Sequence, residues 1–434
     1  MHEQPQPTVI KPALSIQGSV TVPGDKSISH RSIMLGALAR GTTTITNFLR
    51  GEDNFSTMRA FRSMGVPIDD DGTIVRVHGV GLHGLQEPGD LLDCGNSGTT
   101  IRLMTGLLAG QQFFSVLTGD QYLRKRPMKR VSDPLRQMGA QIAGRAGGTL
   151  APLAITGRRL SGITYESKIA SAQVKSALMF AGLYADGETR VTEPSRSRDH
   201  SERMFRFFGA DTTVDTTSVQ VRSGRELQGQ ELVIPSDISS AAFFMVAALL
   251  VPGSELLIQN VGVNPTRTGV LDILQAMGGD IVLLNQREVS GEPVADLQVR
   301  SSRLKGIEIG GDLVPRAIDE FPAICVAAAL AEGTTVIRDA RELRVKETDR
   351  IAAMATNLRS IGSGLIEETD DGMTIQGIEQ LKGGMVASFG DHRIAMSLAV
   401  AALSCSSEVT IDDVSCVATS FPGFFNLISR VAVR

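Results

Sequence analysis

One sequence pattern recurs along this chain and constrains its fold more than any other feature. The first copy, at residues 23–47, reads PGDKSISHRSIMLGALARGTTTITN: a turn with a lysine and a serine, an apolar run, a glycine, and then β-branched residues typical of a strand. Similar stretches begin near residues 95, 167, 235, 315 and 390, and the turns after their apolar runs are spaced by roughly 66–80 residues. Because self-similarity at a regular spacing indicates a repeat architecture, we expect six copies of one helix–strand unit.

A second helix pattern, amphipathic this time, follows in each of the first five copies and ends in an apolar residue plus a glycine. These glycines are Gly65, Gly139, Gly209, Gly278 and Gly362. Glycine is typical of the position just after a helix, so each is predicted to end its helix. Strand patterns follow, for example at residues 73–77, 219–221 and 297–299. Each unit therefore has about βαβαββ content.

The two helix types predict different environments. The first type, such as AAFFMVAALLV at residues 241–251, is apolar on every side and must be buried all round, whereas the second type carries charges and needs only one buried face. Helices on the inside and strands on the outside satisfy both requirements. The predicted fold is therefore an α/β, inside-out barrel arrangement.

The predicted domain boundary follows from two similar turns, PGD at residues 23–25 and PSD at residues 235–237. The last copy ends in a helix pattern, FFNLISRVAVR, without returning strands, while the strand patterns at residues 13–16 and 19–22 follow no helix. We predict two domains of three repeats each: residues 24–235, and residues 236–434 closed by residues 1–23. The chain then crosses twice between domains, which favours a hinge beside a cleft.

Composition excludes several classes of protein. The formal net charge is only −4, the longest apolar run is too short to span a bilayer, and the N-terminal residues lack a signal-peptide pattern. The histidines and cysteines have no metal-ligand spacing, so we expect no metal site and no cofactor, and the four cysteines are predicted to be buried thiols. We expect a cytoplasmic protein without nucleic-acid or membrane partners.

Basic residues gather where helices are predicted to begin. They are Lys26, Arg31, Arg102, Arg124, Lys125, Arg126, Lys129, Arg130, Lys175, Arg344, Lys346, Arg350, His392 and Arg393. A helix start is already partly positive, so cations there indicate a strongly anionic ligand. Taken singly, the groups have plainer readings: a solvated loop at 124–130, a capped helix start at 344–350, a turn lysine at Lys26, and an aspartate N-cap in GDHR at 390–393.

Two glycine patterns and three carboxylates bear on the chemistry. GNSGTT at residues 95–100 leads into a predicted helix, where backbone N–H groups can approach a phosphate or carboxylate; close helix packing is the alternative reading. The GxGxxG match at residues 79–84 is followed by a proline instead of a helix, so it is not a dinucleotide site. Asp319, Glu347 and Asp349 lie among the cations and are candidates for proton transfer.

Eight motifs, in order, resemble the 5-enolpyruvylshikimate-3-phosphate (EPSP) synthase family, also named 3-phosphoshikimate 1-carboxyvinyltransferase. They are GDKSISHR, GNSGTTIRL, KRPM, ASAQVKSALMFAGL, RDHSE, RVKETDR, GDHRIAM and ATSFPGFF, and they cover the chain from about residue 11. The resemblance implies a monomeric transferase of the shikimate pathway, which leads to chorismate and the aromatic amino acids. It also implies a fold of two domains, each of three βαβαββ units.

The resemblance further implies the site residues. Shikimate 3-phosphate would be bound by Lys26, Ser27, Arg31, Ser171, Ala172 through its backbone, Gln173, Arg198, Asp319 and Lys346. Phosphoenolpyruvate would be bound by Lys26, Asn96, Gly98, Arg126, Gln173, Arg350 and Arg393. In the family's pattern Asp319 takes the proton of the substrate hydroxyl, while Glu347 and Lys26 handle the proton at the methylene carbon. Domain closure would complete the site.

Some residues depart from the best-known subgroup of the family. Ala172 replaces a second serine, and the segment Ala418-Thr419-Ser420 lacks a lysine; both features resemble the bacterial subgroup known for tolerance to glyphosate. Gly98, in contrast, is the residue of glyphosate-sensitive members. Two alternatives stay open from the sequence: a UDP-N-acetylglucosamine enolpyruvyltransferase, and a non-catalytic repeat scaffold that binds polyanions.

Overall fold

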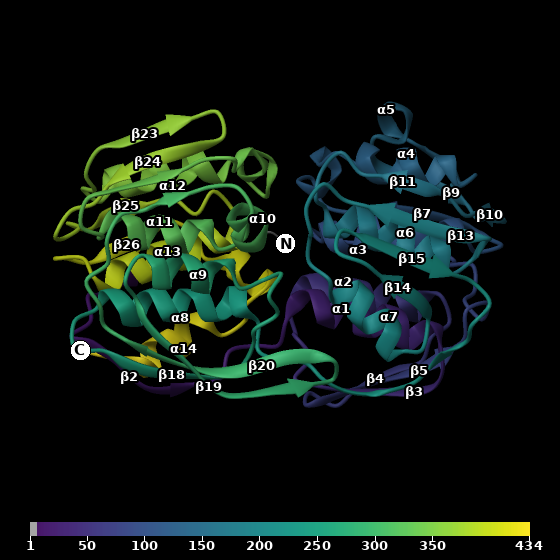
Figure 1. The fold of residues 1–434 in the computed structure, drawn as a ribbon, viewed down its shortest axis with the longest axis horizontal. Helices are drawn as coiled ribbons and strands as arrows, with labels where there is room; N and C mark the ends of the chain where they lie inside the picture. The colour runs from purple at the N-terminus through teal and green to yellow at the C-terminus, as the bar shows by residue number, and fades with distance from the viewer. Residues whose placement is uncertain (1–6) are drawn as a thin grey trace. The chain divides into compact units, whose positions relative to one another are not determined.

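The computed structural model describes residues 7–434, which form two compact units (Figure 1). The N-terminal unit comprises Gly24–Ile234 and Val289–Glu292. The C-terminal unit comprises residues 7–23, Pro235–Glu288 and Pro293–Arg434. Each unit has its own hydrophobic core.

Three sheets of the N-terminal unit share one plan. The first strand pairs in parallel with the second, and the remaining neighbours are antiparallel. The strand orders are β16-β3-β5-β4, β6-β7-β9-β8 and β11-β13-β15-β14, with β17 also pairing with β3 and β10 pairing with β12. The bounds are β3 Ala39–Thr46, β4 Ile68–Asp70, β5 Ile74–Val80, β6 Leu92–Asp93, β7 Phe114–Thr118, β8 Gln141–Gly144, β9 Leu150–Thr156, β10 Leu160–Ser161, β11 Thr164–Glu166, β12 Ala185–Asp186, β13 Glu188–Thr192, β14 Asp211–Val214, β15 Ser218–Arg222, β16 Leu227–Gln228 and β17 Glu231–Val233.

The helices of this unit fall into the two predicted classes. Nearly every residue is buried in the first class, which comprises α1 Lys26–Leu38, α3 Gly98–Ala109 and α6 Ala172–Gly182. The second class keeps exposed positions and comprises α2 Glu52–Ser63, α4 Lys129–Gln137 and α7 His200–Phe207. Two short elements, η1 Leu123–Lys125 and α5 Arg145–Gly148, complete the unit. Helices α3 and α6 pack side by side (Figure 1), which confirms that the all-apolar helices are interior.

In the C-terminal unit the sheet β21-β22-β24-β23 repeats this plan, and the other two sheets each contain one parallel pair, β18 with β2 and β25 with β26. The sheets of this unit have the orders β19-β20-β18-β2-β27, β21-β22-β24-β23 and β1-β26-β25. The strands are β1 Thr8–Ile10, β2 Ser15–Val20, β18 Glu255–Gly262, β19 Asp280–Val289, β20 Glu292–Arg300, β21 Glu308–Ile309, β22 Thr334–Ile337, β23 Ile366–Thr369, β24 Gly372–Gln376, β25 Gly384–Val386, β26 Val409–Ile411 and β27 Ala432–Val433. The helices are α8 Ile238–Leu250, α9 Gly269–Ala276, α10 Leu313–Ala317, α11 Phe321–Ala329, η2 Arg341–Val345, α12 Arg350–Ser360, α13 His392–Leu403, η3 Ser415–Thr419 and α14 Phe424–Val431. Helices α8, α11 and α13 are buried and pack on one another.

The N-terminal segment supplies strands to the sheets of the C-terminal unit. Strand β2 pairs in parallel with β18 and antiparallel with β27, and β1 pairs with β26. The sequence patterns at residues 13–16 and 19–22 predicted two strands, but the structure has one strand, Ser15–Val20. Strand β1 was not predicted, and β27 is a short strand after the last helix, where no returning strand was expected.

Glycines end the second-class helices as predicted. Gly65, Gly139, Gly209, Gly278 and Gly362 each follow a helix with φ between +83° and +94°, a left-handed conformation that glycine adopts without a steric penalty. The glycine after the first apolar run, Gly41, was also expected to end its helix, but this prediction is wrong: α1 already ends at Leu38, and Gly41 lies within β3. After β5 ends at Val80 the chain turns without entering a helix, which confirms that the GxGxxG match is accidental.

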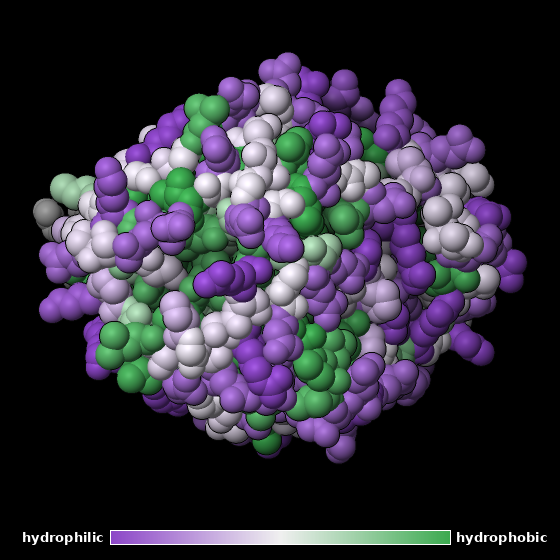
Figure 2. Space-filling view, turned by 60° about the vertical axis from the view of Figure 1, so that its left-hand side comes forward, coloured by the Kyte–Doolittle hydropathy of each residue, from purple (hydrophilic) through white to green (hydrophobic). Residues whose placement is uncertain are grey.

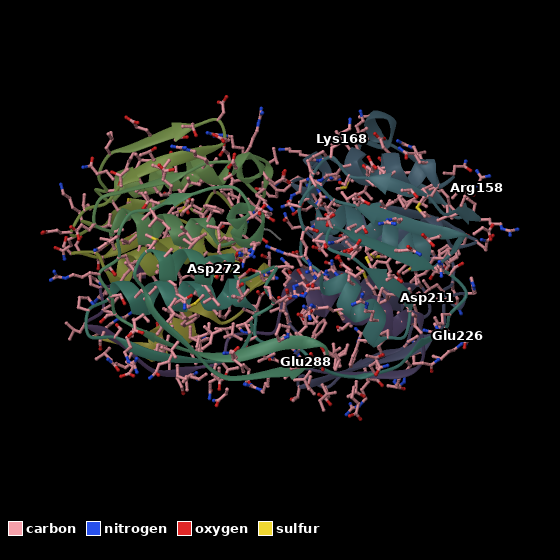
Figure 3. All side chains as sticks on the ribbon, viewed as in Figure 1. Arg158, Lys168, Asp211, Glu226, Asp272 and Glu288 are labelled. Atoms are coloured by element: carbon pink, nitrogen blue, oxygen red, sulfur yellow. The ribbon has the colours of Figure 1, made fainter. Side chains whose placement is uncertain are left out.

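On the face seen in Figure 2, hydrophobic residues lie in separate groups among hydrophilic ones. Charged side chains such as Lys168, Glu226 and Glu288 are exposed (Figure 3). Within residues 7–434 no helix has the length and apolar character needed to cross a bilayer. Three cysteines are buried as predicted, but Cys416 is only partly buried.

Candidate functional site

The first turn of α1 holds Lys26 and Ser27 in place through an aspartate cap. The Asp25 carboxylate accepts a hydrogen bond from the Ile28 N–H at 2.8 Å, which satisfies one of the unpaired donors at the helix start. The Lys26 ammonium pairs with Asp53 at the start of α2 and remains about one-fifth exposed. The Asn54 amide also donates to the Lys26 carbonyl at 3.1 Å. The starts of α1 and α2 are thus joined at the predicted lysine.

Arg31 lies one turn further along α1 and is buried, with 4% of its surface exposed. Its guanidinium donates to the Ser27 carbonyl at 2.9 Å, to Ser176 Oγ on α6 at 2.7 Å and to Ser201 Oγ on α7 at 2.7 Å. The pKa of Arg31 is lowered to about 10, chiefly by burial; Asp25 and Glu202 oppose this change, and the nearby positive charge of Arg198 adds to it. Arg31, Ser27 and Arg198, all predicted from the sequence, therefore belong to one positively charged group.

The glycine-rich segment before α3 places Asn96 and Gly98 beside two arginines. Ser97 caps α3, its Oγ accepting from the Thr100 N–H at 3.1 Å. The Asn96 side chain accepts from Arg126 at 2.8 Å and donates to Asp120 at 2.7 Å. At Gly98 an added Cβ would lie 2.7 Å from Nη1 of Arg102 and 3.2 Å from Nη1 of Arg126. The backbone therefore approaches two guanidinium groups at a helix start, an arrangement suited to an anion.

Gln173 joins this group from the start of α6. Its Oε1 accepts from Nη1 of Arg102 at 2.8 Å, and its Nε2 donates to Thr99 Oγ1 at 3.2 Å. Ser171, two residues before Gln173, caps α6. The N-terminal unit therefore brings together Asn96, Gly98, Arg126 and Gln173 around Arg102, which the sequence singled out only as a cation within a helix.

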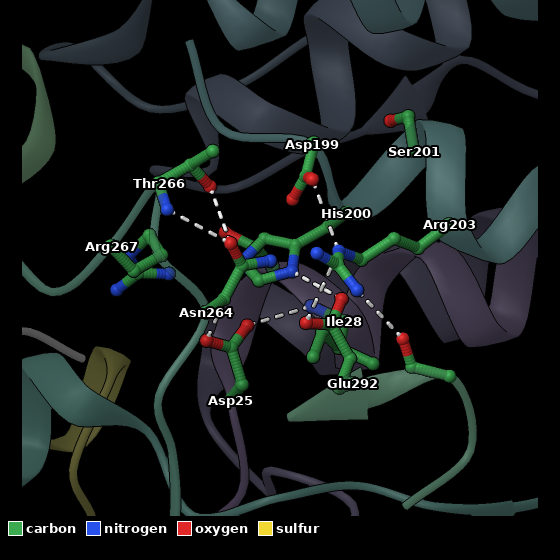
Figure 4. A network of polar contacts seen from close by, with 12 residues as sticks. Asp25, Ile28, Asp199, His200, Ser201, Arg203, Asn264, Thr266, Arg267 and Glu292 are labelled. Atoms are coloured by element: carbon green, nitrogen blue, oxygen red, sulfur yellow. Dashed lines mark hydrogen bonds and ion pairs between the residues drawn. The ribbon is translucent and has the colours of Figure 1, made fainter. Parts of the chain in front are cut away.

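The RDHSE motif at residues 198–202 supports these groups from α7 (Figure 4). His200 is buried; its Nδ1 lies 2.8 Å from Glu292 Oε1, and its Nε2 lies 4.0 Å from the Asp25 carboxylate that caps α1. Arg203 donates to Asp199 at 3.0 Å and to the Gly291 carbonyl at 3.1 Å. The motif thus holds α7 beside the start of α1.

In the C-terminal unit a second group is built around Arg350, the first residue of α12. Arg350 is 2% exposed and its guanidinium binds Asp391 at 2.8 Å and Glu347 at 2.7 Å, with Asp319 at 3.6 Å. Burial opposes the charge on Arg350, but Asp391, Glu347 and Asp319 together raise its pKa above the ordinary value. Arg350 is therefore a permanent cation held by three carboxylates.

Lys346 and Arg393 complete this second group through Asp319. The Lys346 ammonium donates to the Asp319 carboxylate at 3.3 Å, and the Arg393 guanidinium donates to the Asp319 carbonyl at 2.9 Å. Asp319 lies just before α11, Arg350 begins α12, and Arg393 lies in the first turn of α13. The starts of these three helices therefore meet here, together with the loop that carries Lys346. The structure brings together all five residues predicted in this unit: Asp319, Lys346, Glu347, Arg350 and Arg393.

The helix-capping interpretations of residues 344–350 and 390–393 are also correct. Asp349 caps α12, its carboxylate accepting from the Ala352 N–H at 3.0 Å and from Arg344 at 2.7 Å. Asp391 caps α13, its carboxylate accepting from the Arg393 N–H at 2.8 Å. Asp349 and Asp391 thus cap helices and pair with arginines in the same region as the cations around Arg350. Asp349 therefore serves to cap α12 and to pair with Arg344.

Some predicted cations lie elsewhere. Lys175 is 3% exposed and is paired with two buried glutamates, so it does not offer a free charge to a ligand. In the segment 124–130, Arg124, Lys125 and Lys129 are exposed, as the solvated-loop reading predicts, and Arg126 is the residue that reaches Asn96. Among residues 7–434 no three His, Cys, Asp or Glu side chains form a group able to hold a metal ion.

Sequence reasoning missed several acidic partners of the site residues. Asp53 pairs with Lys26, Asp120 with Asn96, and Asp391 with Arg350. Asp120 and Asp391 lie 24 and 41 positions from their partners, so no local motif joins them. The one available signal was the Gly-Asp pair before a helix, which Asp391 shares with Asp25.

The cation groups of the N-terminal and C-terminal units both suit the binding of anions. Helix N-termini with arginine and lysine side chains favour phosphate and carboxylate groups, because peptide N–H donors and cations act on the same anion. Carboxylates beside a lysine, as Asp319 is beside Lys346, are placed to accept or return protons.

Comparisons with known proteins agree over nearly the full chain. The sequence model of the family described as EPSP synthase (3-phosphoshikimate 1-carboxyvinyltransferase) matches residues 10–428. The chain is 68% identical over 429 residues to the 3-phosphoshikimate 1-carboxyvinyltransferase of Geobacter metallireducens, covering 99% of this chain and 100% of that one. It is 69% identical over 423 residues to that of Geobacter sulfurreducens, covering 98% of each. The structure of EPSP synthase from Acinetobacter baumannii is similar with a TM-score of 0.88 at 49% identity, covering 99% of both chains. The chain therefore belongs to the EPSP synthase (3-phosphoshikimate 1-carboxyvinyltransferase) family.

Proposed function

We propose that the chain is a transferase that moves the enolpyruvyl group of phosphoenolpyruvate to the 5-hydroxyl of shikimate 3-phosphate. The products are 5-enolpyruvylshikimate 3-phosphate and phosphate, a step of the shikimate pathway to chorismate and the aromatic amino acids. The observation that carries the proposal is family membership over residues 10–428. The two cation groups support it independently, since both substrates carry a phosphate and a carboxylate.

We assign shikimate 3-phosphate to Lys26, Ser27, Arg31, Ser171, Ala172, Gln173, Arg198, Asp319 and Lys346. Support comes from Arg31, whose buried guanidinium is linked to Ser27 directly and to the Ala172 carbonyl through Ser176. The positive charge of Arg198 acts on the same guanidinium. Three cations that repel one another, Lys26, Arg31 and Arg198, are best offset by a phosphate dianion.

We assign phosphoenolpyruvate to Lys26, Asn96, Gly98, Arg126, Gln173, Arg350 and Arg393. Gly98 supports this, because the absence of a side chain lets the backbone come close to the guanidinium groups of Arg102 and Arg126. Arginine is suited to this task, since its planar guanidinium can bind two oxygens of a carboxylate or phosphate at once.

The proposed reaction is an addition followed by an elimination. The 5-hydroxyl of shikimate 3-phosphate attacks C2 of phosphoenolpyruvate while the methylene carbon gains a proton, and the tetrahedral intermediate then loses phosphate and returns a proton from the same carbon. Asp319 accepts the hydroxyl proton, and Glu347 with Lys26 delivers and removes the methylene proton. The arginines stabilise the charge that moves onto the leaving phosphate.

The finer architecture is also a proposal. We propose that the two compact units are two domains, residues 24–235 and residues 1–23 with 236–434, each an inside-out α/β barrel of three βαβαββ repeats. The shared strand plan of the sheets and the buried first-class helices support it. We further propose that the protein acts as a monomer in the cytoplasm, where its two small-molecule substrates are its only partners.

One assay tests the function. Purified protein is mixed with phosphoenolpyruvate and either shikimate 3-phosphate or UDP-N-acetylglucosamine, and phosphate release is followed. We expect release with shikimate 3-phosphate and none with the sugar nucleotide. Release with the sugar nucleotide alone would overturn the assignment, and release with neither would favour the non-catalytic scaffold.

A further inference from the structure

A buried charge cluster in the N-terminal unit has no place in the proposed reaction. Lys175 on α6 pairs with Glu193, which follows β13, and with Glu202 on α7, each at 2.8 Å. The three side chains are 3%, 2% and 6% exposed, respectively. Because the ammonium is enclosed by protein, it cannot reach a substrate, and the sequence prediction that Lys175 faces an anion is wrong. The cluster must act through other residues or serve stability alone.

Glu193 is the centre of this cluster and joins two segments that carry proposed substrate residues. Its Oε1 accepts from the Ser171 N–H at 2.7 Å, just where α6 begins. Its Oε2 accepts from Ser197 Oγ at 2.7 Å, from the Ser197 N–H at 3.4 Å and from Lys175 at 2.8 Å. Ser171 caps α6, and Ser197 directly precedes Arg198. One carboxylate therefore fixes the helix start at Ser171 relative to the loop that bears Arg198.

The energetics of such a cluster favour a positioning role over a purely stabilising one. Removing an ammonium and two carboxylates from water costs free energy that their mutual attraction often only balances, so apolar side chains of similar volume would stabilise the fold at least as well. Burial raises the pKa of Glu202, although Lys175 opposes the change. What apolar side chains cannot supply is the hydrogen bonding that Glu193 gives to both segments.

We propose that Lys175 and Glu193 are positioning residues for the phosphate group of shikimate 3-phosphate. Lys175 holds the Glu193 carboxylate, and Glu193 in turn holds Ser171 and the loop before Arg198 in their binding geometry. This inference rests on the proposed function, because Ser171 and Arg198 are substrate residues only there. Neither Lys175 nor Glu193 touches the substrate.

The geometry also predicts which substrate is affected. The Gln173 side chain is held separately by Arg102 and Thr99 of α3, so it keeps its anchor when the cluster is broken. Phosphoenolpyruvate is assigned mainly to Asn96, Gly98 and Arg126 and to the C-terminal unit, whereas the segments held by Glu193 serve shikimate 3-phosphate. Loss of the cluster should therefore raise the KM for shikimate 3-phosphate selectively.

The test compares Lys175→Met, Ser197→Ala and Lys175→Arg with the wild type. Lys175→Met removes the charge that holds Glu193, and we expect the KM for shikimate 3-phosphate to rise about tenfold or more, while kcat and the KM for phosphoenolpyruvate change less than about threefold. Ser197→Ala removes one donor to Glu193 and keeps the ion pair, so it should fold and should give the same selectivity with a smaller, roughly two- to fivefold, effect. Lys175→Arg keeps the charge and should restore most of the affinity.

Ser254→Ala provides a matched control for lost buried hydrogen bonding. Ser254 is a buried residue of the C-terminal unit that accepts from the Ile16 N–H at 2.7 Å and lies outside both cation groups. Its loss should lower the melting temperature and leave both KM values unchanged.

The outcomes separate the two proposals. If Lys175→Met and Ser197→Ala leave the KM for shikimate 3-phosphate within twofold of the wild type, or raise both KM values equally, the positioning role is refuted while the proposed function stands. If the wild type releases no phosphate from the two substrates, the proposed function is refuted and the positioning role with it.

Discussion

Gly98→Ala gives a quantitative test of the phosphoenolpyruvate site. The added Cβ would lie 2.7 Å from Nη1 of Arg102, whereas ordinary carbon contacts begin near 3.4 Å. The guanidinium of Arg102 must therefore move by about 0.7 Å, and that of Arg126, at 3.2 Å, by a smaller amount. Arg102 also donates to Gln173 Oε1 at 2.8 Å, so a displacement of this size weakens that hydrogen bond.

The size of the effect follows from this hydrogen bond. A bond from a charged donor is worth about 1.5–3 kcal/mol, and partial loss of about 1–2 kcal/mol corresponds to a roughly five- to thirtyfold loss of affinity. We expect steady-state kinetics to show a rise of this size in the KM for phosphoenolpyruvate. The rise for shikimate 3-phosphate should be smaller because, of the groups displaced near Gly98, only Gln173 is assigned to that substrate. The inhibition constant of glyphosate should rise as well, because the new methyl group takes space in the same pocket.

Gly89→Ala is the matched control. Gly89 has open space where a Cβ would be added and does not have a positive φ, so this variant should behave as the wild type. The reasoning is refuted if Gly98→Ala leaves the KM for phosphoenolpyruvate and the glyphosate inhibition constant unchanged, or if Gly89→Ala alters them equally.

Two further predictions concern stability. Burial, together with the charges of Lys26 and Arg31, holds the pKa of His30 well below its usual value of 6.5. Below pH 6.5 the unfolded chain binds a proton at His30 and the folded chain does not. The free energy of unfolding contributed by the neutral histidine is therefore present above pH 6.5 and is lost as the pH falls. Urea unfolding at pH 7 and pH 5.5 should show a loss of about 1 kcal/mol that His30→Gln lacks, and an identical pH dependence in both proteins would contradict this. Asp391→Asn keeps the cap of α13 but removes the main counter-charge of Arg350. We expect the free energy of unfolding to fall by about 3 kcal/mol. The loss is no larger because Glu347 at 2.7 Å and Asp319 at 3.6 Å still pair with Arg350. An unfolding midpoint equal to that of the wild type would show that the Arg350–Asp391 pair carries no net stability.

Much of the fold could be predicted because its signals are local. An all-apolar segment such as residues 241–251 has only one stable environment, and α8 is indeed interior. The glycines after the second-class helices have left-handed backbone conformations that their sequence position predicts. The short strands were missed, because β1 and β27 have too few residues to show a period and exist through pairing with distant partners.

The candidate site was predictable where charge and helix starts coincide. Lys26, Arg350 and Arg393 lie at helix starts as the sequence indicates. Lys175 shows the limit of this rule: it also lies near a helix start, but its side chain is enclosed by Glu193 and Glu202, which come from other elements. Charge position along a helix can be read from the sequence, whereas the direction of a side chain and its distant acidic partner depend on tertiary packing.

The most direct test of the account is the affinity for shikimate 3-phosphate measured by calorimetry in Lys26→Ala and Lys346→Ala. These lysines belong to the N-terminal and C-terminal units, respectively. Each charge-assisted contact is worth about 1.5–3 kcal/mol, so each variant should bind shikimate 3-phosphate about ten- to a hundredfold more weakly than the wild type. Wild-type affinity in either variant would contradict the proposed assignment of that lysine to shikimate 3-phosphate.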